Sequence, residues 1–158
     1  MSTKQESERD RLARNLTELL QELRVAMAGI QILFGFLLTV AFTQRYESAD
    51  SVVHGLHLTA MLLAVAATAL LSATAAWHRL LFRQRQREEI VRFGNWTALC
   101  GLGCVVGAMT ATLGLVVDVV LGHLWAAAVA AVTGVAFVLL WFVLPLRLRY
   151  LDIRRGPK

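Results

Sequence analysis

The chain has 158 residues, of which 57% are hydrophobic, and its formal net charge at pH 7 is +5. Such an apolar composition is atypical of a soluble domain of this size and predicts a single membrane domain. A net positive charge often indicates nucleic-acid binding. Here, however, the basic residues adjoin long apolar segments, where anionic lipid headgroups are the nearer partner. We therefore expect contact with a lipid bilayer and no nucleic-acid partner.

The N-terminal segment, residues 1–24, predicts an amphipathic cytoplasmic helix. Leu12, Leu16, Leu19 and Leu23 recur at helical spacing. No Pro or Gly occurs before Gly29, so we expect this helix to run without a break into the first membrane span. Three covers are compatible with its apolar stripe: the headgroup region, the basic middle loop, or a second copy of the helix.

Four apolar segments follow, each near the roughly 20 residues that cross ~30 Å of hydrocarbon. They are residues 25–43, 55–77, 96–121 and 125–144. Pro145 coincides with the exit of the fourth span. The fold class is therefore all-α: a membrane-embedded bundle of four transmembrane helices, residues 25–146, followed by a basic cytoplasmic tail, residues 147–158. We also expect the segment between the second and third spans to be helical.

The basic residues predict the orientation of these spans. All but one of the 16 Lys and Arg residues lie before the first span, between the second and third, or after the fourth, and Arg45 is the exception. Because cytoplasmic loops carry an excess of Lys and Arg, both termini are expected in the cytoplasm. Contact with anionic headgroups is expected from Arg79, Arg83, Arg85, Arg87, Arg147 and Arg149.

Small residues form a stripe along the third span. Gly103, Gly107, Ala111 and Gly114 follow one another at helical spacing, which lets a neighbouring backbone approach closely. The neighbour could be another helix of the same chain or the same helix of a second copy, so a homo-oligomer is one interpretation of this stripe.

Polar residues within the spans are the candidates for function. Asp118 is the one carboxylate inside an apolar run, and it lies near the outer end of the third span. His57 and His123 are its predicted partners, and such a cluster could relay protons or bind a metal cation. Alternatively, these are interfacial histidines beside a hydrated aspartate. No recognised metal-ligand spacing is present, so the sequence itself predicts no metal site.

Gln31 lies about two turns inside the first span. An amide at this depth is typical of a hydrogen bond between helices, and the alternative is a place in a permeation path. The sequence has no phosphate loop, nucleophile elbow or paired carboxylates within one span, so we expect neither enzymatic activity nor a cofactor.

Three stretches carry a resemblance: NLTELLQELRVAMAGIQILFGFLLTVAF (residues 15–42), WHRLLFR (residues 77–83) and the region of Asp118. They resemble a family of small bacterial four-span membrane proteins of unknown function, some of whose members carry an automatic label of sodium and proton antiporter. The resemblance covers nearly the whole chain. It implies a multi-pass protein of the bacterial cytoplasmic (inner) membrane.

Two functional hypotheses follow. The first is a small ion- or proton-coupled transport component, acting as an oligomer through Asp118, His57, His123 and Gln31. The alternative is a non-catalytic membrane scaffold or regulatory subunit that uses its cytoplasmic helix to bind a partner. A water-accessible passage from the Asp118 cluster to Gln31 would favour transport, and a dry apolar core would favour the scaffold.

Overall fold

The computed structural model describes the backbone of residues 2–81 and 87–147, and the side chains of residues 21, 23–73, 76 and 96–147. The elements are α1 (Ser2–Ala41), α2 (Gln44–Glu47), α3 (Ser51–Leu81), α4 (Arg87–Leu121) and α5 (His123–Val138), followed by a π-helical turn, η1 (Leu139–Val143). The described part of the chain contains no strand. The uninterrupted helix α1 confirms that the N-terminal helix continues into the first span.

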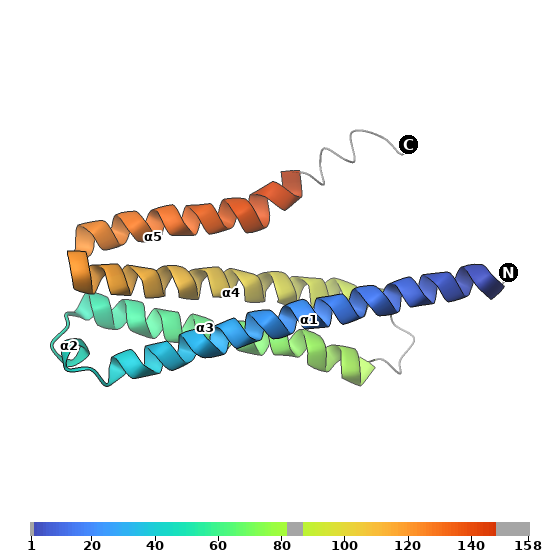
Figure 1. The fold of residues 1–158 in the computed structure, drawn as a ribbon, viewed down its shortest axis with the longest axis horizontal. Coiled ribbons are helices and arrows are strands. Elements are labelled where there is room, and N and C mark those ends of the chain that lie inside the picture. The colour runs from blue at the N-terminus through green and yellow to red at the C-terminus, as the bar shows by residue number, and fades with distance from the viewer. Residues whose placement is uncertain (1, 82–86, 148–158) are drawn as a thin grey trace.

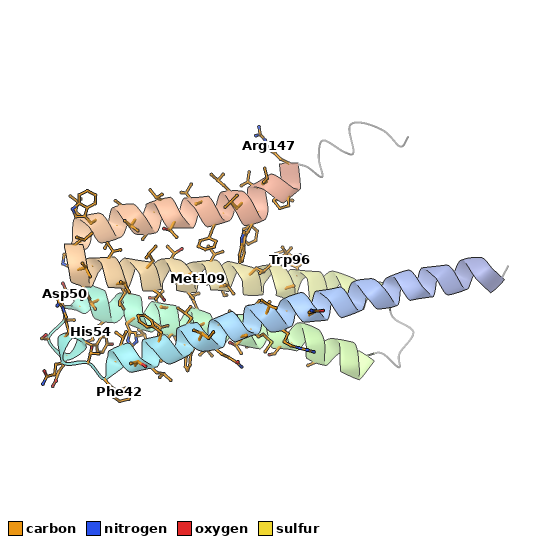
Figure 2. All side chains as sticks on the ribbon, viewed as in Figure 1. Phe42, Asp50, His54, Trp96, Met109 and Arg147 are labelled. Carbon is orange, nitrogen blue, oxygen red and sulfur yellow. The ribbon has the colours of Figure 1, made fainter. Side chains whose placement is uncertain are left out.

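The long helices run up and down in a row rather than closing a ring (Figure 1). Helix α4 packs between α3 and α5, and α1 packs mainly on α3. Helix α2 and the α4–α5 turn lie at one end of the molecule, here called the loop end, where Figure 2 labels Asp50 and His54. The N-terminus and Arg147 lie at the other, the terminal end, beyond which α1 projects. This order leaves broad outward faces on α1 and α5.

Four segments are long and apolar enough to cross a membrane: Leu23–Ala41, Ser51–Ala73, Trp96–Leu121 and His123–Arg147. They correspond to the four predicted spans. The second begins at Ser51 rather than at residue 55 because the Asp50 carboxylate accepts hydrogen bonds from Val52 N and Val53 N, both at 3.0 Å, and so caps the helix. Of the predicted middle helix, residues 79–81 belong to α3 and 87–93 to α4, while residues 82–86 lie outside the described residues.

The core lies between α1, α3 and α4 and is apolar. Ala60, Ala64 and Ala67 place a line of small buried side chains along α3. Around them pack buried residues of the other two helices, namely Ile30, Leu37, Val105, Ala108 and Ala111. Between transmembrane helices, close van der Waals contact of this kind is the main attraction, because lipid is as apolar as the side chains.

The predicted stripe on α4 is largely an intramolecular contact. A Cβ on Gly107 would lie 2.8 Å from Leu63 Cδ1 of α3, and one on Gly114 would lie 3.5 Å from Ala130 Cβ of α5. Ala111 is buried in the core. Gly103 is exposed, and a Cβ there would meet nothing within 4 Å, so Gly103 takes no part in these contacts.

The fourth span does not end at Pro145, as its helix continues to Arg147. Proline has no N–H to donate, and its ring crowds the carbonyl four residues earlier, which here is that of Trp141. The π-helical turn Leu139–Val143 surrounds that carbonyl, and its wider turn accommodates the ring without breaking the helix.

Candidate functional site

A one-residue turn at the loop end creates the candidate site. Gly122 joins α4 to α5 with φ +86° and ψ 173°, a conformation open almost only to glycine. Gly122 N donates to the carbonyl of Asp118 at 2.9 Å, and Gly122 O accepts from Ala126 N at 3.1 Å. The turn therefore places His123, the first residue of α5, beside the last turn of α4.

Asp118 and His123 form a close contact across this turn. His123 Nδ1 lies 2.6 Å from Asp118 Oδ1. The Asp118 side chain is 1% exposed, whereas that of His123 is 63% exposed. The second carboxylate oxygen, Asp118 Oδ2, is buried and has no hydrogen-bond partner among the residues that the structure describes. An unpaired acidic oxygen at the end of an apolar helix is the least satisfied group of the site.

Asp50 completes the arrangement from the start of α3. Its Oδ2 lies 3.0 Å from His123 Nε2, while its Oδ1 caps α3. The hydrogen bond from Val53 N lowers the pKa of Asp50, and burial, the next-largest effect, opposes it. The nearby His123, a second hydrogen bond from Val52 N and the nearby His54 also lower this pKa, which lies below its ordinary value of 3.8. Asp50 is therefore ionised at neutral pH. We call Asp50, His123 and Asp118 the acidic cluster.

The acidic cluster has few hydrogen-bond donors for its carboxylates. Both ring nitrogens of His123 face carboxylate oxygens. A carboxylate only accepts hydrogen bonds, and a neutral imidazole has a single N–H, so a neutral His123 donates to only one of the two carboxylates. The cluster therefore offers oxygen and nitrogen lone pairs to a cation.

His57 is buried but belongs to a different contact. Its Nε2 lies 2.9 Å from the Leu37 carbonyl of α1, and its Nδ1 lies 2.8 Å from the Tyr46 hydroxyl of α2. A carbonyl only accepts, so Nε2 carries the proton and the Tyr46 O–H donates to Nδ1. Both ring nitrogens are thus occupied, and neither is left for Asp118. His57 ties α1, α2 and α3 together, and His54 packs on the other side of Tyr46, with ring centroids 4.5 Å apart.

Arg45 links α2 to the C-terminal end of α4. Its guanidinium donates to the Val119 carbonyl at 3.0 Å, one residue from Asp118. A cation near the last carbonyls of a helix complements the negative end of the helix dipole. The one basic residue outside the three sequence clusters is therefore a structural cap in this fold.

The remaining predicted residues lie away from the acidic cluster. Gln31 is on an exposed face of α1 inside the first span. Arg147 is exposed at the terminal end. The backbones of Arg79 and Arg87 belong to α3 and α4, but their side chains are outside the described residues, as are Arg83, Arg85 and Arg149 entirely.

Sequence reasoning missed Asp50 and Tyr46 as members of the loop-end contacts. Asp50 had a readable signal, because an aspartate directly before an apolar helical run is a typical N-cap. Nothing in the sequence linked Tyr46 to His57, since their contact depends on the position of α2 against α3.

Four apolar helices in up-and-down order define a multi-pass helical membrane protein. A family model, the family of unknown function DUF6328, matches residues 5–145. The chain therefore belongs to this family, which confirms the expected membership of a family without established function. No curated protein and no solved structure matches the chain.

Proposed function

We propose that this protein is a non-catalytic membrane scaffold that associates with a second copy of itself along α1. The observation that carries the proposal is the position of Gln31. It lies ten residues before the end of α1 at Ala41, about 15 Å along the helix and so near the middle of ~30 Å of hydrocarbon.

The Gln31 amide faces outward and has no hydrogen-bond partner among the described residues. Its neighbours on the same face of α1 are apolar: Ala28 and Gly35 are exposed, and Leu38 is 41% exposed. Lipid tails cannot satisfy an amide, and leaving one unpaired in an apolar medium costs roughly 2–7 kcal/mol. A second helix can supply the missing donor and acceptor.

A second copy is a suitable partner for chemical reasons. A glutamine amide both donates and accepts, so two copies of Gln31 are complementary to each other. A two-fold axis brings the same residue of both subunits together, which permits this pairing. Hydrogen bonds of this kind between membrane helices contribute about 1–2 kcal/mol.

The apolar core supports the scaffold over transport through one copy. Between the acidic cluster and the terminal end, α4 buries the apolar side chains of Leu115, Ala111, Ala108 and Val105. The one buried hydroxyl residue among them in the described structure, Thr112, donates to the Ala108 carbonyl of its own helix. Gln31 faces away from this core. The polar residues that a transport path would need thus lie on opposite sides of packed apolar side chains.

The proposed orientation of the protein in the membrane follows from the distribution of its basic residues. We place the terminal end, with Arg147 and the other basic clusters, against the anionic headgroups of the bacterial inner membrane on the cytoplasmic side. The acidic cluster then faces the outer side. The part of α1 that projects past the bundle offers a cytoplasmic surface for a regulatory partner.

Ion- or proton-coupled transport by an oligomer is the rival proposal. The unpaired oxygen of Asp118 favours it, because a buried acid beside a histidine is a suitable binding group for a transported cation. In this proposal the path would run between copies rather than through one.

Disulfide crosslinking in native membranes tests the scaffold. In a background of Cys100→Ala and Cys104→Ala, Gln31→Cys should give a crosslinked dimer on oxidation. The matched control is Val132→Cys, which is 70% exposed on α5 and should remain monomeric. Separately, Gln31→Leu in the otherwise unchanged chain should weaken the dimer by roughly 5- to 30-fold, the equivalent of the lost hydrogen bonds.

A flux assay distinguishes the rival. In proteoliposomes loaded with a pH-sensitive dye, the scaffold predicts no dissipation of a proton gradient when sodium or a divalent cation is added. If cations dissipate the gradient and Asp118→Asn abolishes this response, the scaffold proposal is wrong and the transport proposal takes its place. Equal crosslinking at positions 31 and 132 would refute the α1 contact.

A further inference from the structure

We infer that the acidic cluster is a binding site for a divalent transition-metal cation of the zinc type. Asp50, Asp118 and His123 each offer one ligand atom, and these atoms all lie within 4.8 Å of one another. They come from three separate segments: the residue before α3, the last turn of α4 and the first residue of α5. The inference goes beyond the scaffold and does not depend on self-association.

The donor atoms select the class of cation. Two carboxylate oxygens and one imidazole nitrogen are typical ligands of Zn²⁺ and related transition metals, which leave a fourth position for water. Calcium takes about six to eight oxygen ligands and magnesium about six, and neither favours an imidazole. The cluster therefore fits a transition metal better than an alkaline-earth ion.

The buried oxygen of Asp118 provides a second, independent indication of a ligand. The side chain is 1% exposed, its Oδ1 points to His123, and its Oδ2 has no partner among the described residues. A carboxylate buried at the end of an apolar span is costly unless a cation compensates it. A divalent ion bound by both carboxylates and a neutral imidazole would compensate this charge.

Only a small rearrangement is needed to close the site. An imidazole binds one metal through one nitrogen, so His123 must give up one of its two carboxylate contacts. Its side chain is 63% exposed and that of Asp50 is 47% exposed, so both can move without disturbing the core. Ligand atoms around a tetrahedral zinc lie roughly 3.3 Å apart, so the present spread of 4.8 Å requires a modest contraction.

Metal binding changes the charge of the site but breaks no covalent bond within the ligands. Coordination needs an imidazole nitrogen with a free lone pair and two ionised carboxylates, and any proton that these ligands carry leaves to solvent as Zn²⁺ enters. Zinc does not change its oxidation state, and no other reactant takes part.

The test uses the full chain, purified in detergent without a polyhistidine tag and freed of metal with a chelator. Titration with Zn²⁺ alone, followed by calorimetry, should show one saturable site per chain. Titration with Co²⁺ alone should give the visible absorption of a four-coordinate site, which Zn²⁺ then removes.

Four variants decide the assignment. His123→Gln and Asp118→Asn should each weaken Zn²⁺ binding by more than about 100-fold, because each removes a ligand rather than a supporting contact. Asp50→Asn should also weaken it while keeping the cap of α3, since asparagine caps as well as aspartate. The control is His54→Gln, at the same end and outside the cluster, which should bind as wild type does. Asp50 and His123 are partly exposed, so their variants should fold. They test the site even if Asp118→Asn does not fold.

Three results would overturn the inference. The first is the absence of saturable Zn²⁺ binding below about 100 µM. The second is binding that survives both Asp50→Asn and His123→Gln, since the metal would then be elsewhere, for example on Cys100 and Cys104. The third is equal competition by Ca²⁺, which would show an oxygen site without the imidazole.

Discussion

The glycines of α4 allow a test of the α3–α4 contact at the scale of single atoms. A Cβ on Gly101 would lie 2.8 Å from Leu71 Cδ2, 2.9 Å from Leu71 Cγ and 3.3 Å from Leu70 Cβ. Leu71 is fully buried, and the Cβ of Leu70 can move only with its backbone. The two helices must therefore separate to accept a methyl group at position 101. Gly103, two residues further on, has open space at the same position.

The expected magnitude comes from comparing Gly101→Ala with Gly103→Ala. Both replacements add the same helix-forming tendency, up to about 1 kcal/mol for an exposed helix in water, and this contribution cancels in the comparison. Overpacking of a filled core costs typically 1–3 kcal/mol. We therefore expect Gly101→Ala to be less stable than Gly103→Ala by about 1–3 kcal/mol, and Gly103→Ala to be at least as stable as wild type.

Gly107→Ala supplies an intermediate case. Its Cβ would meet Leu63 Cδ1 at 2.8 Å, but Leu63 Cδ2 and Cγ are each 3.8 Å away. The crowded atom is the end of a partly exposed side chain, so a rotation of Leu63 relieves most of the contact. The predicted order of stability is Gly103→Ala, then Gly107→Ala, then Gly101→Ala.

Equilibrium unfolding in mixed micelles measures this order. The fraction of SDS that half-unfolds each variant is determined by circular dichroism, and size-exclusion chromatography verifies the same oligomeric state before unfolding. If Gly101→Ala equals or exceeds Gly103→Ala in stability, the close approach of α3 and α4 at Leu71 is refuted.

Three shorter predictions concern the loop end and the orientation. Gly122→Ala should lower the free energy of unfolding by about 1–3 kcal/mol, because its φ of +86° strains any side chain, and thermal unfolding in detergent measures the loss. Tyr46→Phe should cost about 1–3 kcal/mol in the same assay, since it leaves His57 Nδ1 buried without a donor. Labelling of single cysteines by an impermeant maleimide should modify Ser48→Cys from outside and Ser2→Cys only after permeabilisation, and the opposite pattern would reverse the charge-based orientation.

Hydropathy and helical spacing were sufficient to predict the long helices, but not α2 or the π-helical turn. Four apolar runs of span length, with no Pro or Gly before Gly29, predicted the four segments and the long first helix that the structure contains. These properties depend on neighbours in the chain and on the apolar solvent. They need no knowledge of which helix lies beside which.

The contacts of the packing stripe on α4 were harder to predict than its spacing. Eleven residues cover about 1,100°, or roughly 20° more than three full turns, so Gly103 and Gly114 point in nearly the same direction from the helix axis. A Cβ on Gly114 would nonetheless lie 3.5 Å from Ala130 of α5, whereas one on Gly103 would meet nothing within 4 Å, and Gly101, outside the stripe, faces Leu71 of α3. The contacts of the stripe therefore depend on how closely the neighbouring helices approach α4 at each level, which the sequence does not specify.

The candidate site was only half predictable for a similar reason. His123 follows Asp118 by five residues, and the tight turn at Gly122 brings the two together, so this pair depends on local sequence. The choice between His57 and Asp50 as the third member depends on how the start of α3 sits against the α4–α5 turn. The two residues are seven positions apart, on the cap and on the buried face of one helix.

Depth in the bilayer separates the two polar features of this protein. Asp118 lies three residues from the end of α4, where water can deliver a cation and the helix end is near the headgroups. Gln31 lies near mid-depth, where burying a neutral amide costs much less free energy than burying a charged group. The hydroxyls of Thr112 and Thr110 lie between these two levels on α4, the first donating to the Ala108 carbonyl and the second buried without a partner among the described residues. A transport path along a seam between two copies would bring the two Gln31 residues together, so the Gln31 crosslink that tests the scaffold also tests that path.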